Sequence, residues 1–413
     1  MINDCSMKNS LDFLISPYTR ERFFQDYFEQ RHLHIKADDP ERFNHILSAA
    51  TLEHIVSSQK LTLPNTRMAH KDSDLDANQL TLEGTNIIDL NRVIEKYSEG
   101  ATLILSQLQD RVETLKSLCN TLTADFGQRF QTNIYCTPGN SSQGFTIHHD
   151  THDVFILQIE GSKDWKIYES PIELAIKDQG FKQELHQPGA VIDEFTMNPG
   201  DLLYIPRGLM HAAKTSNKRS IHITTGFMGF TWQDFMIDKI NKISQEHLDL
   251  RRGFQPDFWN NPQQYEAVYK RILGILGQPQ ELQSGLNHLY QHSLNRFRVS
   301  TLNPIAQAEA IHHLNLDTQL VVEENSMSFV EQISDTELSI TLYNKEVTLP
   351  AALMPVIEFI TETKSFQLKD LPLLDDAGKI NLAQTLLKAG MLRSKTLGQE
   401  RATEVLNGFA TSL

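Results

Sequence analysis

Cysteine is scarce in this 413-residue sequence, and long apolar runs are missing. The three cysteines, Cys5, Cys119 and Cys136, are widely separated, and no two have the spacing of metal ligands. An odd number of scattered cysteines gives no disulfide framework and is typical of a reducing compartment. No apolar stretch reaches roughly 18 residues, and no basic leader with an apolar run stands at the N-terminus. We therefore expect a cytoplasmic protein with no membrane partner.

Positive charge is also in deficit, with 38 Lys and Arg against 52 Asp and Glu and a formal net charge of −14. Such a charge repels a phosphate backbone, so nucleic acid is a poor candidate ligand. It would attract a basic partner, although it also serves plain solubility. Hydrophobic residues make up 40% and charged residues 22%, which is ordinary for globular proteins. The length predicts two or three folded domains.

The spacing of apolar residues changes along the chain. Residues 11–60 show helical spacing. From Gln131 to about Phe230 short β-rich runs (VFILQI, WKIYE, LLYIP and SIHITTGF) alternate with turn signals (PGN, EGSKD, NPGD and PRG). This pattern predicts an antiparallel barrel or sandwich. From Trp232 to about Asn325 the spacing is helical again.

The C-terminal part combines strand-like SFVEQISDTELSITLYN with two helical stretches joined by SFQLKDL, which predicts a winged-helix-like module. Residues 331–413 contain 11 acidic and 8 basic residues, so we expect packing or protein interaction rather than DNA binding. The predicted domains are 1–230, a barrel with N-terminal helices, 231–325, a helical middle domain, and 326–413, the winged-helix-like module.

His148 and Asp150 form a His-x-Asp pair in QGFTIHHDTHDVFILQI. Side chains two apart in a strand share a face, so an imidazole and a carboxylate can bind one ion, although a lone pair of this kind also arises by chance. His211 ends NPGDLLYIPRGLMH, far enough downstream for a barrel to return its strand beside the first. Two histidines and one carboxylate leave positions open and suit non-haem Fe(II), whereas zinc more often takes a third His or a Cys.

Further histidines near this motif compete for the ligand role. His152 shares strand parity with His148, but four residues along a strand span about 13 Å, too far for one ion unless the strand turns. We expect His149 and His152 at the pocket rim or in solvent, and His222 as a hydrogen-bonded core residue. Core positions are expected for Phe155 and Trp165.

The segment NIYCTPGNSSQGFTIHHDTHDVFILQIEGSKDW, with PGDLLYIPRGLMH, resembles the JmjC-domain ribosomal oxygenases, cupin-like protein hydroxylases that depend on Fe(II) and 2-oxoglutarate. The likeness is most specific over residues 131–230 and loose elsewhere, as in DYFEQRHLHIK. It implies an α+β protein with a double-stranded β-helix (cupin/JmjC jelly roll) core. It also implies a homodimer formed through the helical middle domain, although a helical face there could equally pack on the barrel.

Carried over to this sequence, the family's iron ligands fall on His148, Asp150 and His211. Lys163, in GSKDW, falls where relatives place a basic residue on the distal carboxylate of 2-oxoglutarate. A dianion that enters a barrel loses hydration and needs a fixed cation, which makes this role reasonable. A surface lysine in a hairpin is the alternative.

Asn133 and Tyr135 alternate on one strand face and resemble positions that line the co-substrate pocket, as does Thr224 on a later strand. Ordinary barrel packing is the alternative for each of these three residues.

The resemblance implies an enzyme that uses dioxygen and 2-oxoglutarate to hydroxylate a protein side chain and releases succinate and CO₂. A basic ribosomal protein is the expected substrate, and the acidic surface suits such a partner. One alternative is the same chemistry on another peptide or a small metabolite. The other is a cupin-like binding or scaffold protein that has kept the metal and lost turnover.

Overall fold

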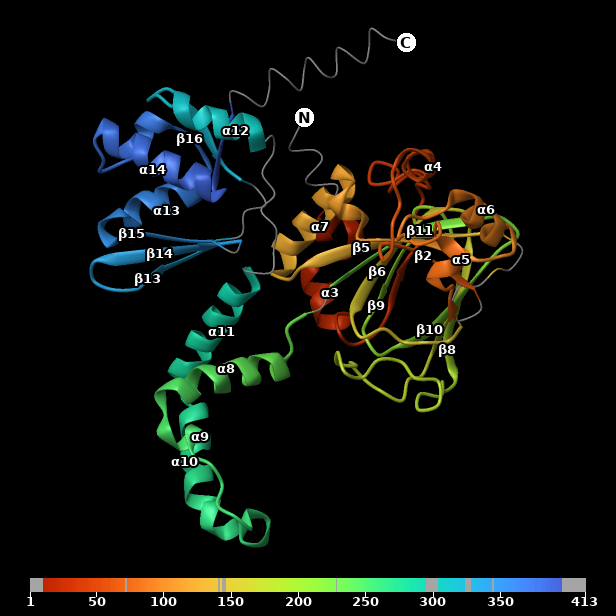
Figure 1. Ribbon diagram of the computed structural model, residues 1–413, viewed down its shortest axis with the longest axis horizontal. Coiled ribbons are helices and arrows are strands. Elements are labelled where there is room, and N and C mark those ends of the chain that lie inside the picture. The colour runs from red at the N-terminus through yellow and green to blue at the C-terminus, as the bar shows by residue number, and fades with distance from the viewer. Residues whose placement is uncertain are drawn as a thin grey trace. The chain divides into compact units, whose positions relative to one another are not determined.

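The computed structural model describes residues 10–70, 73–139, 142, 146–227, 229–294, 304–323, 328–343 and 345–395 (Figure 1). The contacts divide the chain into two compact units, Met1–Gly229 and Phe230–Leu413, and each has its own hydrophobic core. Cys5 and Asn140 of the PGN signal lie outside the described residues, as does the C-terminal module beyond residue 395. Within the described ranges, no helix combines the length and the apolar character that crossing a membrane requires.

An eight-stranded antiparallel sheet with the order β1-β9-β6-β11-β5-β4-β2-β3 forms the centre of the first unit. A three-stranded antiparallel sheet, β10-β7-β8, packs against it through a shared apolar cluster. The strands of the large sheet are β1 (Leu33–Ile35), β2 (Thr66–His70), β3 (Ser73–Asp74), β4 (Thr102–Ser106), β5 (Phe130–Thr137), β6 (Asp153–Glu160), β9 (Leu202–Ile205) and β11 (Ser220–Phe227). Those of the small sheet are β7 (Lys163–Tyr168), β8 (Val191–Met197) and β10 (Met210–Thr215).

The central strand β6 is buried on both faces, which explains its continuous apolar sequence VFILQI. Phe155 and Leu157 point to the core on one side of the large sheet. Val154 and Ile156 point the other way, toward Trp165 and the small sheet. The β-rich runs expected between Gln131 and Phe230 are therefore confirmed, and they enclose an interior between two sheets.

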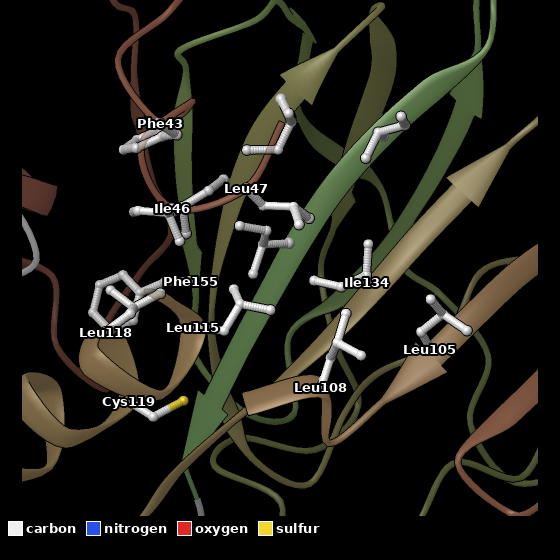
Figure 2. Packing of buried hydrophobic residues seen from close by; sticks show 14 of the residues in the cluster. Phe43, Ile46, Leu47, Leu105, Leu108, Leu115, Leu118, Cys119, Ile134 and Phe155 are labelled. Atoms are coloured by element: carbon white, nitrogen blue, oxygen red, sulfur yellow. The ribbon is translucent and has the colours of Figure 1, made fainter. Parts of the chain in front are cut away.

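Helices cover the outer face of the large sheet. Leu115 and Leu118 of α7 lie in one apolar cluster with Ile134 of β5 and Phe155 of β6 (Figure 2). This packing leaves the opposite face of the sheet to form the interior. The helices of the first unit are α2 (Leu11–Ile15), α3 (Arg20–Asp26), α4 (Ala49–Ser58), α5 (Ala77–Leu80), α6 (Leu90–Ser98) and α7 (Glu113–Phe126), with the 3₁₀ turn η1 (Leu108–Asp110).

Strand β1 falls inside the segment 11–60 that we expected to be helical. Its buried residues Leu33 and Ile35 alternate with His34, and the strand pairs with β9 at the edge of the large sheet. A three-residue strand is too short to interrupt a helical pattern, so only its tertiary partner reveals it.

The second unit begins with the helices that follow β11. Gly285 of α11 allows close contact with α8, because a Cβ at that position would lie 2.8 Å from a ring carbon of Phe235. Apolar side chains remain exposed along these helices, including Trp232, Ile237 and Tyr269. The elements are α8 (Trp232–Glu246), α9 (Leu248–Arg251), η2 (Phe258–Asn260), η3 (Pro262–Tyr265), α10 (Glu266–Leu276) and α11 (Pro279–Leu294).

The rest of the second unit builds two small antiparallel sheets, β16-β12-β17 and β13-β14-β15, around a core that includes α13 and α14. The side chain of Gln307 in α12 hydrogen bonds both the N–H and the C=O of Ser394 in β17. The elements are α12 (Pro304–Ala310), η4 (Ile311–His313), β12 (Gln319–Val322), β13 (Ser328–Gln332), β14 (Glu337–Leu342), β15 (Lys345–Pro350), η5 (Ala351–Leu353), α13 (Met354–Thr363), β16 (Ser365–Gln367), η6 (Leu368–Asp370), α14 (Asp376–Ala389) and β17 (Leu392–Ser394).

Strand β12 corrects the expectation of helix up to about Asn325. Leu320 is fully buried in the second core, and β12 pairs with β16 and β17, which come much later in the chain. Periodicity reports only on neighbouring residues and does not detect pairing with strands that are distant in sequence. The strand was therefore not distinguished from the helical segment before it.

Candidate active site

The backbones of His148 and His211 pair directly with each other. The N–H of His148 donates to the C=O of His211 at 3.1 Å, and the N–H of His211 donates back at 2.8 Å. Residues that exchange both hydrogen bonds in an antiparallel pair place their side chains next to each other on one face. The two imidazole centroids are accordingly 4.6 Å apart.

This arrangement corrects our expectation that His148 and Asp150 lie on one regular strand. The segment before β6 is irregular, and His148 joins it to β10 through a single bridge. The N–H of Gly208 donates to the C=O of Asp150 at 2.8 Å, which anchors the segment a second time.

Both histidines have their Nδ1 atoms committed to the backbone. Nδ1 of His148 lies 2.8 Å from the C=O of Thr146, and Nδ1 of His211 lies 3.0 Å from the C=O of Leu209. A carbonyl can only accept, so each neutral ring carries its proton on Nδ1 and offers the Nε2 lone pair. This partnership also fixes the orientation of a metal-binding imidazole.

One ligand atom from each of His148, Asp150 and His211 lies within 4.8 Å of the others. Burial lowers the pKa of His211 to about 4, so its Nε2 is free of a competing proton at neutral pH. Burial would raise the pKa of the Asp150 carboxyl, but the surrounding histidines, led by His152, lower it on balance. Two imidazole nitrogens and one carboxylate fit a single divalent ion with positions left open.

A buried ion-pair network supports the turn that precedes His211. Arg207 contacts Glu29 and also Asp153 at 3.0 Å, and the hydroxyl of Tyr204 donates to Asp153 at 2.7 Å. Gly208 follows with φ +84°, and a Cβ there would lie 2.8 Å from the C=O of Ile172. The turn therefore needs glycine, and the network ties it to the start of β6 just after Asp150.

A cavity of about 220 Å³ opens beside the three ligands, between the two sheets. Given about 30 Å³ per liquid water molecule, this volume accommodates a small dicarboxylate. Strands of both sheets contribute to its wall. The lining residues are Arg67, Thr102, Tyr135, Thr137, His148, Asp150, Val154, Ile156, Lys163, Trp165, His211, Ala213, His222 and Thr224.

Lys163 lies in this cavity with 6% of its surface exposed. It starts β7, where side chains alternate inward and outward, and it shares the inward face with Trp165. Burial lowers its pKa to about 8. No carboxylate within the described ranges forms an ion pair with its ammonium group. Because Lys163 is buried, the alternative that it is an exposed surface lysine in a hairpin is wrong.

Tyr135 and Thr224 also line the cavity, from β5 and β11. Burial raises the pKa of Tyr135 to about 12, so its hydroxyl stays protonated and can donate. Asn133 lies on the same face of β5 and opposite Thr224 in register, but it is not one of the lining residues. Its role as a co-substrate contact stays a prediction.

A family model described as "JmjC domain" matches residues 107–235. This chain therefore contains a region similar to the JmjC domain. The matched range contains the three clustered ligands and Lys163. Among solved structures, that of the Escherichia coli ribosomal oxygenase YcfD covers 92% of this chain with a TM-score of 0.54 and 16% identity, over 98% of its own length. At this identity the likeness shows the fold, a JmjC/cupin-like arrangement of helices and sheets.

Curated relatives carry oxygenase names. The "Bifunctional lysine-specific demethylase and histidyl-hydroxylase NO66" of Dictyostelium discoideum is 31% identical over 255 residues, 59% of this chain and 49% of the relative. "Ribosomal oxygenase 2" of Rattus norvegicus is 28% identical over 324 residues, 76% of this chain and 69% of the relative. This chain therefore spans about half the length of the first of them.

Three other histidines of the matched range differ in their surroundings. His149 is buried rather than at the rim or in solvent, and its Nε2 lies 3.3 Å from Nδ1 of His186. His152 is half-buried and packs on Gly226, where a Cβ would lie 2.6 Å from its ring. His222 is buried, but its Nδ1 has no hydrogen-bond partner in the described part of the chain.

Sequence reasoning also missed cavity residues that lie outside the motifs. Thr137 continues the parity of Asn133 and Tyr135 along β5, so strand alternation alone could have found it. Arg67 lies on β2, upstream of the matched range, and its guanidinium is held by Asp74 at 2.8 Å. No local signal marks Arg67, because only the sheet order brings β2 to the cavity.

Proposed function

We propose that this chain is an Fe(II)- and 2-oxoglutarate-dependent oxygenase that hydroxylates a protein side chain. One observation carries the proposal: a two-histidine, one-carboxylate cluster shares a cavity with the buried cation Lys163, for which the described part of the chain offers no ion-pair partner. The cluster fits a metal that keeps open positions, and the lysine fits a second, anionic ligand. In support, a solved structure of the fold neighbour YcfD is a complex with cobalt and 2-oxoglutarate.

Each residue has a defined task in this proposal. His148, Asp150 and His211 hold the iron, and Lys163 holds the distal carboxylate of 2-oxoglutarate, with Tyr135 as an added donor. Bound iron with 2-oxoglutarate and dioxygen supplies the oxidation of a substrate C–H bond. The apolar part of the cavity wall, which includes Val154, Ile156 and Trp165, limits the access of water to the reacting groups.

The proposed substrate is a basic ribosomal protein. The printed names of the relatives, ribosomal oxygenase and histidyl-hydroxylase, support this class. The net charge of −14 favours association with a basic partner. Another peptide or a small metabolite would use the same residues.

Several finer assignments belong to the same proposal. The two facing sheets are consistent with a double-stranded β-helix, and the sheets with α13 and α14 are consistent with a winged-helix-like module. We keep the division into 1–230, 231–325 and 326–413. Homodimerisation through the middle helices is supported by the apolar side chains exposed along α8 and α10. Absence of direct DNA binding and a cytoplasmic location rest on charge and cysteine content.

Succinate formation tests the enzyme against a scaffold that only binds metal. Iron-loaded wild type should form succinate in air, not anaerobically, and faster when a mixture of ribosomal proteins is added. Asp150→Ala should form none. Asp164→Ala, a change to an exposed carboxylate on β7, serves as the matched control and should behave as wild type. Fully metallated wild type that forms no more succinate than Asp150→Ala would leave the scaffold as the better reading.

A further inference from the structure

His222 lies at the same part of the cavity as Lys163 but has no role in the proposed function so far. It lines the cavity from β11 and is 4% exposed. Its ring is stacked on Tyr135, with centroids 4.8 Å apart and planes 5° from parallel, and the edge of Trp165 meets it at 74°. These two contacts fix the plane of the imidazole.

The hydrogen bonding of this ring is incomplete. Nδ1 is fully buried with no partner in the described part of the chain. A buried N–H without an acceptor is rarer in proteins than a buried acceptor without a donor. The neutral ring therefore carries its proton on Nε2, which leaves Nε2–H available to a molecule in the cavity.

The charges around His222 favour an anionic occupant. Burial and then the charge of Lys163 lower the pKa of His222 well below its ordinary value, so the ring is neutral. Among the cavity-lining residues, the one carboxylate is Asp150, which belongs to the metal cluster. Arg67 is paired with Asp74. For Lys163 and the Nε2–H of His222, no protein acceptor is found among the described residues, and the Nε1–H of Trp165 in the same wall also lacks one.

We propose that His222 is a second anchor, beside Lys163, for the distal carboxylate of the dicarboxylate co-substrate: Nε2–H of His222 donates to one carboxylate oxygen while the ammonium group of Lys163 holds the other. This inference rests on the proposed function and deepens it. It makes the pocket selective for 2-oxo acids with a second carboxylate, because a ligand without one leaves both donors unpaired.

Calorimetry on Mn(II)-loaded protein without oxygen tests this assignment. The two ligands are 2-oxoglutarate and 2-oxopentanoate, which has the same carbon chain without the distal carboxylate. His222→Leu should weaken 2-oxoglutarate about tenfold or more, as expected for a lost hydrogen bond to a charged group. It should leave the affinity for 2-oxopentanoate within about twofold.

Two polar variants test the same inference if His222→Leu fails to fold. The amide of His222→Gln reaches the position of Nε2 and should retain affinity within about threefold of wild type, whereas the shorter His222→Asn reaches only Nδ1 and should lose about tenfold. Metal stoichiometry should match wild type in each variant, because His222 is not part of the metal cluster. The thermal midpoint of each variant is measured to confirm that it is folded at the temperature of the titration.

The outcomes separate this inference from the proposed function. Wild type that binds neither Mn(II) nor 2-oxoglutarate overturns the proposed function and the anchor together. Wild type that binds both, with unchanged 2-oxoglutarate affinity in His222→Leu or with equal losses for Gln and Asn, overturns the anchor alone. Equal weakening of both ligands by His222→Leu assigns His222 to the shape of the pocket and likewise overturns it.

Discussion

The binding of 2-oxoglutarate should depend on pH through Lys163. Burial lowers the pKa of the free lysine to about 8, since no carboxylate of the described residues offsets the loss of hydration. A bound carboxylate supplies that missing charge and restores the pKa toward about 10.4. Binding above pH 8 therefore requires proton uptake, and affinity falls as pH rises through this value.

The magnitude follows from the fraction of lysine that is charged before binding. With a pKa of about 8, roughly nine-tenths of the free protein is charged at pH 7 and roughly one-tenth at pH 9. The affinity should then drop about tenfold over this range, equivalent to about 1.4 kcal/mol. Proton uptake per ligand should rise from about 0.1 at pH 7 to about 0.9 at pH 9.

Titrations in buffers of different ionisation enthalpy measure this uptake on Mn(II)-loaded protein. Lys163→Met should bind 2-oxoglutarate weakly and lose the pH dependence. Lys166→Met, which changes an exposed lysine on the other face of β7, should keep both the affinity and the pH dependence. Wild-type affinity that stays flat from pH 7 to pH 9, without proton uptake, would refute a buried, unpaired Lys163.

Three other predictions follow from the described contacts. His211→Ala should abolish stoichiometric Mn(II) binding, whereas His152→Ala should retain it. Metal analysis after dialysis measures both. The reverse result would mean that His152, not His211, is the third metal ligand. Arg207→Met should lower the free energy of unfolding by about 3 kcal/mol because it removes the positive charge that is paired with the buried carboxylate of Asp153. Lys166→Met, which breaks an exposed ion pair, should cost under about 1 kcal/mol in the same urea titration. Deletion of residues 331–413 should not change duplex DNA binding, because none is expected at physiological salt; micromolar, salt-sensitive binding that the deletion abolishes would contradict this.

The sequence predicted those parts of the fold that local patterns encode. The run VFILQI is apolar throughout because β6 is covered on both faces, and KDWKIY alternates because β7 is covered on one. The short strands β1 and β12 were missed because their pairing partners are distant in sequence. Arg67 was missed for the same reason.

In the candidate site, too, local patterns predicted some residues and missed those that depend on distant parts of the chain. His148, Asp150 and His211 were predicted from residue type and spacing, although the regular strand expected to align the first two is replaced by a single bridge to His211. Lys163 was predicted by resemblance, and its inward parity with Trp165 now gives a physical reason. Burial of His149 depends on His186, in the loop between β7 and β8, which no local pattern near His149 indicates.

The contrast between buried charges in the first unit bears directly on function. Asp153 is paired with Arg207 and Tyr204, and Asp201 accepts from the backbone N–H groups of Ala37 and Asn198. Buried charged groups in folded proteins usually have such partners, so a buried lysine without one is unusual. Among the buried charged residues of the described chain, Lys163 is the one for which no hydrogen bond or ion pair is formed. Nδ1 of the neighbouring His222 has no hydrogen-bond partner in the described part of the chain, which assigns the ring's proton to Nε2 and leaves Nε2–H as a donor. A site that binds an anionic ligand reversibly needs donors without a protein acceptor in its wall. A permanent protein partner would compete with the ligand for these donors.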